Sequence, residues 1–165
     1  MILRYNYYTS VEESVHGGEE TFAAPLGKIP IHVRGGNVIP TQNPASNTVA
    51  SRKNPFGLII ALDDSDKASG ELYWDEGDSL EPIVTGQYAL FQFYVQNARQ
   101  VLAVSRQNKL TTTAEGSQSI ASGMTMGSLT ILGVTSAPGS VRVNGNNVNF
   151  AYSNGVSGGN DVMEA

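Results

Sequence analysis

Carboxylates are the side chains in this sequence whose spacing could support catalysis. They gather in two clusters, namely Asp63, Asp64 and Asp66, and Asp75, Glu76 and Asp78. A pair of carboxylates can act as general acid and base, or one of them as a nucleophile. A catalytic acid, however, requires a pocket that raises its pKa, whereas both clusters fall at expected hairpin tips, where aspartate suits the turn backbone and solvent. We therefore interpret both clusters as turns and expect no catalytic residue in this chain.

Metal-binding chemistry has little support in the sequence. Residues 63–66 (DDSD) bring oxygen ligands close together, but they lack the glycine and the closing glutamate of an EF-hand loop. The two histidines, His16 and His32, have no second ligand at a fixed spacing, and the chain has no cysteine. We expect neither a metal site nor another cofactor.

Trp74 is the aromatic residue for which a sugar-binding role has to be weighed. An exposed tryptophan beside Tyr73 could stack on the face of a sugar, as in carbohydrate-binding modules. The expected position of Trp74 within a hairpin strand instead favours packing in the core or at a domain interface. Trp74 and Tyr73 remain the two candidates for sugar stacking.

The segment Ile29–Pro40 (IPIHVRGGNVIP) is the element around which the chain is expected to be organised. Alternation places three apolar side chains on one face, those of Ile29, Ile31 and Val33. Gly35 and Gly36 permit positive φ and therefore a tight turn or a bulge that changes the direction of the chain. Because prolines in and beside the segment lack an amide donor, we expect an edge or entry strand rather than a central one.

Six residues are expected to fix loops rather than to bind substrate. They are Arg34, Gly35, Gly36, Arg52, Asp75 and Gly77, and we refer to them as the structural hub. The two arginines could pair with nearby carboxylates such as Asp75. Gly77 supplies a permissive backbone to the turn that follows Trp74.

Patterns of apolar residues predict short strands along the whole chain and no helix. Strands are expected at 56–62, 71–74, 87–95, 100–106, 126–134, 140–144 and 147–152. The first two should form a hairpin, the next two should pair, and the last two should form a hairpin about Gly145. Residues 153–165 show no strand pattern, which predicts an unpaired sheet edge.

These elements predict an all-β fold with antiparallel β-sandwich architecture. Residues 1–22 form a polar and aromatic leading segment, and residues 23–110 form the main sandwich. Residues 111–165 begin with a polar linker and form a smaller, incomplete β domain. In the leading segment the tyrosines, including Tyr5, Tyr7 and Tyr8, are expected to be partly buried against the sandwich.

Charge and hydropathy exclude two classes of partner. The formal net charge of −5 argues against nucleic-acid binding, which requires a basic face. No apolar run approaches the ~20 residues that span a bilayer, so we expect no membrane insertion. The first residues (MILRYNYYT) also lack the apolar region and cleavage site of a signal peptide.

Three motifs in order carry a resemblance to a known family. They are APLGKIPIHVRGGNVIP at 24–40, SRKNPFGLIIAL at 51–62 and GELYWDEGDSLE at 70–81. Together they resemble glycoside hydrolase family 31, and within it the α-glucosidases of the lysosomal, maltase-glucoamylase and sucrase-isomaltase type. Residues 5–20 and 131–145 extend the resemblance to nearly the whole chain up to about residue 152.

The resemblance implies that this chain corresponds to the C-terminal β-sandwich domains that follow the catalytic barrel. In the family the nucleophile and the acid/base are aspartates of the barrel, and no match to the nucleophile motif occurs here. The parent enzyme would hydrolyse terminal α-linked glucose from malto-oligosaccharides with retention of configuration. We expect this chain to be inactive alone, to buttress the barrel, and to belong to a secreted or lysosomal protein.

Two other classes of function stay open at this point. A carbohydrate-binding module would bind α-glucans through exposed aromatic residues on one face. A stand-alone structural or interaction protein would use the unpaired edge and the exposed barrel-facing patch for self-association.

Overall fold

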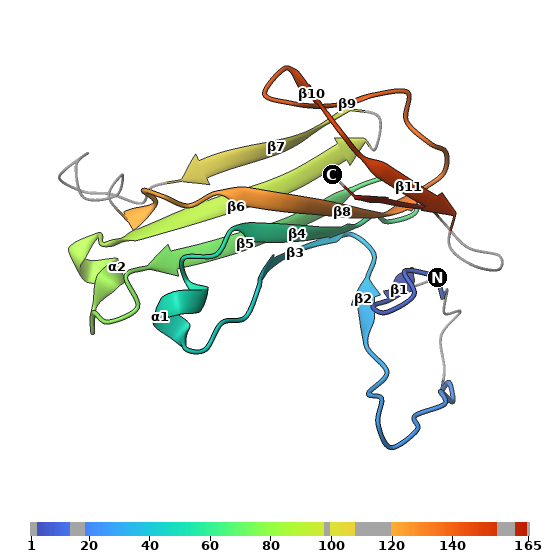
Figure 1. Ribbon diagram of the computed structural model, residues 1–165, viewed down its shortest axis with the longest axis horizontal. Coiled ribbons are helices and arrows are strands. Elements are labelled where there is room, and N and C mark those ends of the chain that lie inside the picture. Colours follow the sequence, from blue (N-terminus) through green and yellow to red (C-terminus); the bar gives the residue numbers. More distant parts are fainter. Residues whose placement is uncertain (1–2, 14–18, 98–99, 108–119, 155–160, 165) are drawn as a thin grey trace.

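The computed structural model describes residues 3–13, 19–97, 100–107, 120–154 and 161–164 (Figure 1). Their strands are β1 (Arg4–Asn6), β2 (His32–Arg34), β3 (Asn37–Gln42), β4 (Phe56–Ala61), β5 (Ala68–Asp75), β6 (Tyr88–Asn97), β7 (Gln100–Gln107), β8 (Met126–Val134), β9 (Val141–Val143), β10 (Asn146–Val148), β11 (Ala151–Asn154) and β12 (Asp161–Glu164). Two one-turn helices, α1 (Thr48–Ser51) and α2 (Pro82–Thr85), lie in loops. The prediction of an all-β fold is confirmed. Within the described ranges, no helix is long and apolar enough to cross a membrane.

One eight-stranded sheet dominates the molecule, in the order β11-β12-β8-β4-β3-β5-β6-β7. Two small sheets, β1–β2 and β9–β10, accompany it. Most pairs are antiparallel, as expected, but β3 pairs in parallel with β5, and β4 in parallel with β8. The large sheet therefore contains strands from both sides of the expected boundary at residues 110 and 111, which itself lies outside the described residues.

β3 lies in the interior of the sheet, so the expectation of an edge strand is wrong for it. It pairs with β4 over its whole length, but with β5 only through Asn37 and Ser69. Pro40, which cannot donate a hydrogen bond, thus lies where β5 makes no ladder with β3. Because β3 separates β4 from β5, the predicted hairpin of residues 56–62 with 71–74 is also wrong; β5 pairs with β6.

The segment that precedes β3 is only partly extended. Val33 in β2 is buried, but Ile29 and Ile31 are exposed, so the predicted apolar face is wrong for these two residues. The strand begins at His32, and residues 29–31 have no strand partner to hold them in alternation. The predicted turn at Gly35 and Gly36 is confirmed, with φ +86° at Gly36.

The end of the chain contains a strand, contrary to expectation. β12 lies between β11 and β8 and pairs with both, Tyr152 facing Met163 and Ile131 facing Met163 from the other side. The strand is short and its sequence carries no alternation, so hydrogen bonding to two neighbours determines its conformation. β11 is consequently the strand at this edge of the sheet.

Several predicted strands agree closely with the structure. β8 has the bounds that the sequence indicated, β4 is buried along most of its length, and β7 pairs with β6. In β6 the side chains of Ala89, Phe93 and Val95 are buried, so this face of the strand points into the core. Asn144 and Gly145 both have positive φ, which forms the tight turn between β9 and β10.

Among the residues that the structure describes, the core has two clusters that share β4 and β8. The larger lies on one face of the sheet and includes Leu58, Ile60 and Phe93. The smaller attaches the β1–β2 unit to the other face and centres on Tyr5, which is 1% exposed. The Tyr5 hydroxyl donates to the Leu62 carbonyl at 2.8 Å, which satisfies the one polar atom that burial would otherwise penalise. Burial raises the pKa of Tyr5 above its ordinary value.

Candidate functional site

Arg52, Trp74 and Phe56 form a packed cluster at the end of β5 where α1 and β5 meet. The Arg52 guanidinium carbon lies 3.8 Å from the centre of the Trp74 ring, a cation–π contact. Phe56 meets the same ring edge-on, with centroids 5.1 Å apart at 85°. Because Arg52 covers a face of the indole, that face is closed to a sugar.

Asp75 and Gly77 complete this cluster. Arg52 Nη2 donates to the backbone carbonyl of Asp75, so the arginine binds the residue that the sequence suggested, but through its main chain. The Asp75 carboxylate instead accepts the amide of Gly77 at 2.8 Å. Gly77 has φ +83°, and a Cβ there would lie 3.3 Å from the guanidinium carbon, so only glycine suits both the turn and the arginine.

Tyr73 points to the opposite face of β5 from Trp74. Its side chain is 41% exposed and stacks on Tyr88, with centroids 5.5 Å apart and planes at 21°. Partial burial and a hydrogen bond to Asp75 raise the pKa of Tyr73. The two sequence candidates for sugar stacking therefore lie on different faces of one strand and do not form a common platform.

The remaining hub residues lie away from this cluster, at the turn between β2 and β3. A Cβ on Gly35 would lie 2.9 Å from the Leu62 carbonyl oxygen, so close backbone packing requires glycine there. Arg34 is exposed, and no ion pair joins it to Asp75 or to another carboxylate of the described residues. The structure thus places the six hub residues in two separate groups.

The acidic residues after β4 build a turn. Asp63 Oδ1 accepts the amides of Ser65 and Lys67 at 2.8 and 2.9 Å, and Asp66 has φ +58°. Within the described part of the chain, no group of three or more histidine and acidic side chains could hold a metal ion. His16 lies outside that part.

A second cluster, which we call the N-terminal clasp, holds the β1–β2 unit together. It consists of Arg4, Glu13, Glu20, Phe22 and His32. His32 Nε2 lies 2.5 Å from Glu13 Oε2, and Arg4 pairs with Glu20. Phe22 lies between the two pairs, 4.6 Å from the Arg4 guanidinium carbon and 4.8 Å from the His32 ring centre. Burial alone raises the pKa of Glu13, but hydrogen bonds from Asn6 and His32 and nearby positive charge outweigh it and lower that pKa.

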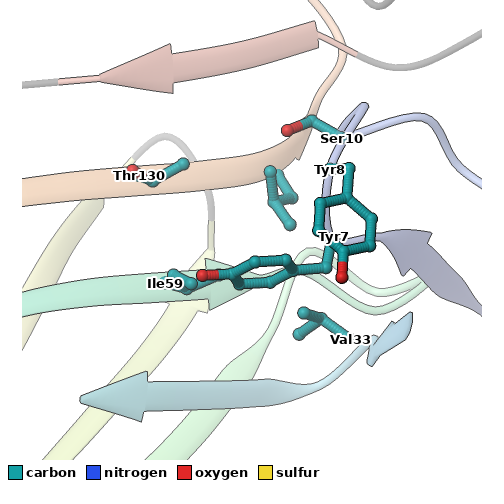
Figure 2. Close-up of a pocket in the computed structure, with 7 residues that line it drawn as sticks. Tyr7, Tyr8, Ser10, Val33, Ile59 and Thr130 are labelled. Atoms are coloured by element: carbon teal, nitrogen blue, oxygen red, sulfur yellow. The ribbon is translucent and has the colours of Figure 1, made fainter. Parts of the chain in front are cut away.

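A hollow of about 380 Å³ lies between the turn after β1 and the face of the main sheet (Figure 2). Tyr7 and Tyr8 line one side, and Figure 2 shows the Tyr7 ring reaching across toward Ile59. The apolar floor comes from Val33, Ile59 and Leu132, and Ser10 and Thr130 add hydroxyl groups to the lining. We call this feature the tyrosine hollow.

Sequence reasoning did not identify the tyrosine hollow. Its lining comes from β1–β2, β4 and β8, which the pattern of apolar residues cannot bring together. The two tyrosines were expected to be partly buried, and each is about half exposed, whereas Tyr5 is the buried anchor. The consecutive aromatic residues at positions 7 and 8 were the available signal, because alternation cannot bury both of them on one face.

Comparison with known proteins shows extended similarity to α-glucosidases and glucoamylases. The chain is 41% identical over 152 residues to glucoamylase 1 of Candida albicans, which covers 92% of this chain and 14% of that protein. It is 44% identical over 135 residues to the lysosomal α-glucosidase of Rattus norvegicus, which covers 81% of this chain and 13% of that protein. No family model matches the chain.

The fold is also that of a solved enzyme. The glucosidase II α subunit in a Glc1Man2-bound form superimposes with a TM-score of 0.79 at 22% identity, which covers 99% of this chain and 19% of that one. The chain thus matches only a small part of each relative. Over that part, it belongs to glycoside hydrolase family 31 and corresponds to the C-terminal region of the family's α-glucosidases.

Proposed function

We propose that this chain is the accessory, C-terminal portion of a retaining α-glucosidase and has no hydrolase activity alone. The observation that carries the proposal is sequence identity above 40% to glucoamylase 1 and lysosomal α-glucosidase, confined to 14% and 13% of their lengths. The parent activity would be hydrolysis of terminal α-linked glucose from malto-oligosaccharides. The two carboxylates that this chemistry needs would belong to the catalytic barrel of the parent enzyme.

The physical role of the chain would be to support that barrel. Apolar side chains that a separate domain would not leave in water are found at two places. Val49 of α1 and Leu80, Ile83 and Val84 in and beside α2 are exposed at one end of the sheet, Leu80 to 99%. Leu26 and Ile29 are exposed in the loop before β2, below the other end (Figure 1). A partner that contacts both places would remove this surface from water.

Turnover by the purified chain is the first test. We expect no release of product from a chromogenic α-glucoside, because both acidic clusters form exposed turns. Turnover would contradict the proposal and would direct attention to the turn at Asp75–Asp78.

Assembly with the rest of an enzyme is the second test. The C. albicans glucoamylase 1 without its matched region should gain solubility and activity when this chain is co-expressed with it. Replacing Leu80 and Ile83 by lysine should weaken this effect, whereas Val143→Lys, a matched change on the distant β9–β10 hairpin, should not. A chain that forms a stable homodimer through Leu80 and Ile83, without assembling with the enzyme, would instead support the stand-alone interaction protein.

Cellular location follows from the same proposal. A relative at 44% identity carries the name lysosomal α-glucosidase, which supports a lysosomal or secreted parent protein.

A further inference from the structure

We propose that the tyrosine hollow binds a neutral saccharide, with a pyranose ring lying against Tyr7 and Tyr8. The support role proposed above needs no ligand, so this site is an additional function of the chain. The α-linkage of the probe used below rests on the proposed function, whereas the saccharide chemistry rests on the hollow itself.

The size and lining of the hollow suit a small polyhydroxylated ligand. Its volume of about 380 Å³ falls within the range of roughly 300–1,000 Å³ that small-molecule sites occupy. Such sites combine apolar and aromatic side chains with a few placed polar groups. This hollow has two phenol rings, three aliphatic side chains and the hydroxyls of Ser10 and Thr130, and its exposed lining is more polar than apolar. A sugar ring matches this combination, because its C–H face can contact the aromatic rings while its hydroxyls form hydrogen bonds with Ser10 and Thr130.

The charge of the lining argues for a neutral ligand. The residues that line the hollow are uncharged, and the nearby Lys28 makes a cation–π contact with one of them, its Nζ lying 5.0 Å from the centre of the Tyr8 ring. A phosphate or carboxylate placed in the hollow would lose water and find no positively charged side chain among the lining residues, which is unfavourable. The exposed Tyr7 and Tyr8 rings remain as the main contact surface.

The turn that presents the two tyrosines is held in place before any ligand binds. The Asn6 side chain accepts the amides of Tyr8 and Thr9 at 3.0 and 3.2 Å, and its carbonyl accepts the amide of Ser10. The Tyr7 amide donates to the Ile31 carbonyl at 2.9 Å, which ties the turn to the segment before β2. The backbone of Ser10 has φ +60°, which is uncommon for a residue other than glycine and is found more often at functional sites. A fixed turn reduces the ordering cost of binding.

Titration calorimetry of the purified chain with maltotriose tests the proposal. We expect saturable binding, and a loss of at least tenfold in affinity for Tyr7→Ala and for Tyr8→Ala. Tyr8→Phe, which keeps the ring, should bind nearly as well as the unaltered chain. Tyr94→Ala is the matched control, because it removes an exposed tyrosine on β6, and it should leave binding unchanged. Thermal melts would verify that every variant is folded.

Three results would overturn the proposal. They are an absence of saturable binding, equal binding by the Tyr7 and Tyr8 variants and the unaltered chain, and a loss of binding only in Tyr94→Ala. A fourth would do so as well: if Tyr7→Ala binds no less sugar but abolishes assembly with the glucoamylase part, the hollow belongs to the docking surface. Because the gain in solubility is measured without sugar, failure of the support role and failure of the saccharide site can be told apart.

Discussion

At the scale of single residues, Arg52 makes a cation–π contact and a hydrogen bond whose loss can be measured. Its guanidinium stacks on Trp74 and donates to the Asp75 carbonyl. Arg52→Met keeps the aliphatic stem but loses both contacts, so we expect the free energy of unfolding to fall by about 1–3 kcal/mol. Arg52→Lys keeps the charge without the planar fork and should lose part of that.

Urea unfolding followed by tryptophan fluorescence is the measurement, since Trp74 is the single tryptophan and reports on this cluster alone. Lys53→Met, which removes the exposed neighbouring cation, serves as the control and should change stability little. Equal stabilities of the Arg52 and Lys53 variants would show that the cluster contributes nothing to folding.

Gly133 is a second residue with a testable role, because there is no room for a side chain at its position. It has φ +88°, and a Cβ there would lie 2.2 Å from the Tyr5 hydroxyl oxygen. Gly133→Ala should therefore displace Tyr5 from its carbonyl partner and lower stability by about 2 kcal/mol or more. Gly27→Ala, where a Cβ would meet nothing within 4 Å, should leave the melting temperature nearly unchanged. An unchanged melting temperature in both variants would contradict this account of the Tyr5 anchor.

At the scale of elements, the N-terminal clasp should make the β1–β2 unit sensitive to acid. The pKa of Glu13 in the folded chain lies below its ordinary value of 4.5. Burial acts to raise this pKa, but hydrogen bonds from Asn6 and His32 lower it by more. A carboxylate with a lowered folded pKa contributes stability above its unfolded pKa, and this contribution is lost as pH falls through the folded value. The stability that Glu13 contributes is therefore lost below pH 4.5. The ion pair between Arg4 and Glu20 forms the other side of the cluster.

Thermal melts between pH 6 and pH 3 measure this effect, and Glu13→Gln should flatten the decline of the melting temperature below pH 4.5. Glu19→Gln, at an exposed position, is the control and should retain the decline of the unaltered chain. If both variants decline alike, the acid sensitivity has another source.

At the scale of the whole molecule, the local pattern of apolar residues predicted where the strands lie better than it predicted which strands pair with each other. The apolar run of β4 and the alternation of β6 identify strands because burial on one face leaves a period of two. Neither pattern states which strands pair, so the insertion of β3 between β4 and β5 could not be foreseen. β12 was not predicted for a related reason, since pairing with two neighbouring strands, rather than the pattern of its own residues, keeps it extended.

The sites follow the same rule. Arg52, Asp75 and Gly77 could be grouped from the sequence because Asp75 and Gly77 share a turn and an arginine can pair with a carboxylate such as Asp75, although the structure joins Arg52 to the Asp75 main chain. The tyrosine hollow could not, because Ser10 and Thr130 meet only through the tertiary fold. Trp74 was singled out by its residue type, yet the stacking of Arg52 on its ring is a contact that residue type does not reveal.

The parallel pairing of β4 with β8 also affects how the chain is made. β4 (FGLIIA) leaves the ribosome well before Met126 of β8 can pair with Phe56. Until then, one edge of an apolar, β-branched strand has no partner and can recruit the same strand of another chain. Nascent chains of this protein should therefore depend on chaperones until β8 emerges, and a stop codon between β7 and β8 should yield aggregates rather than a smaller soluble protein.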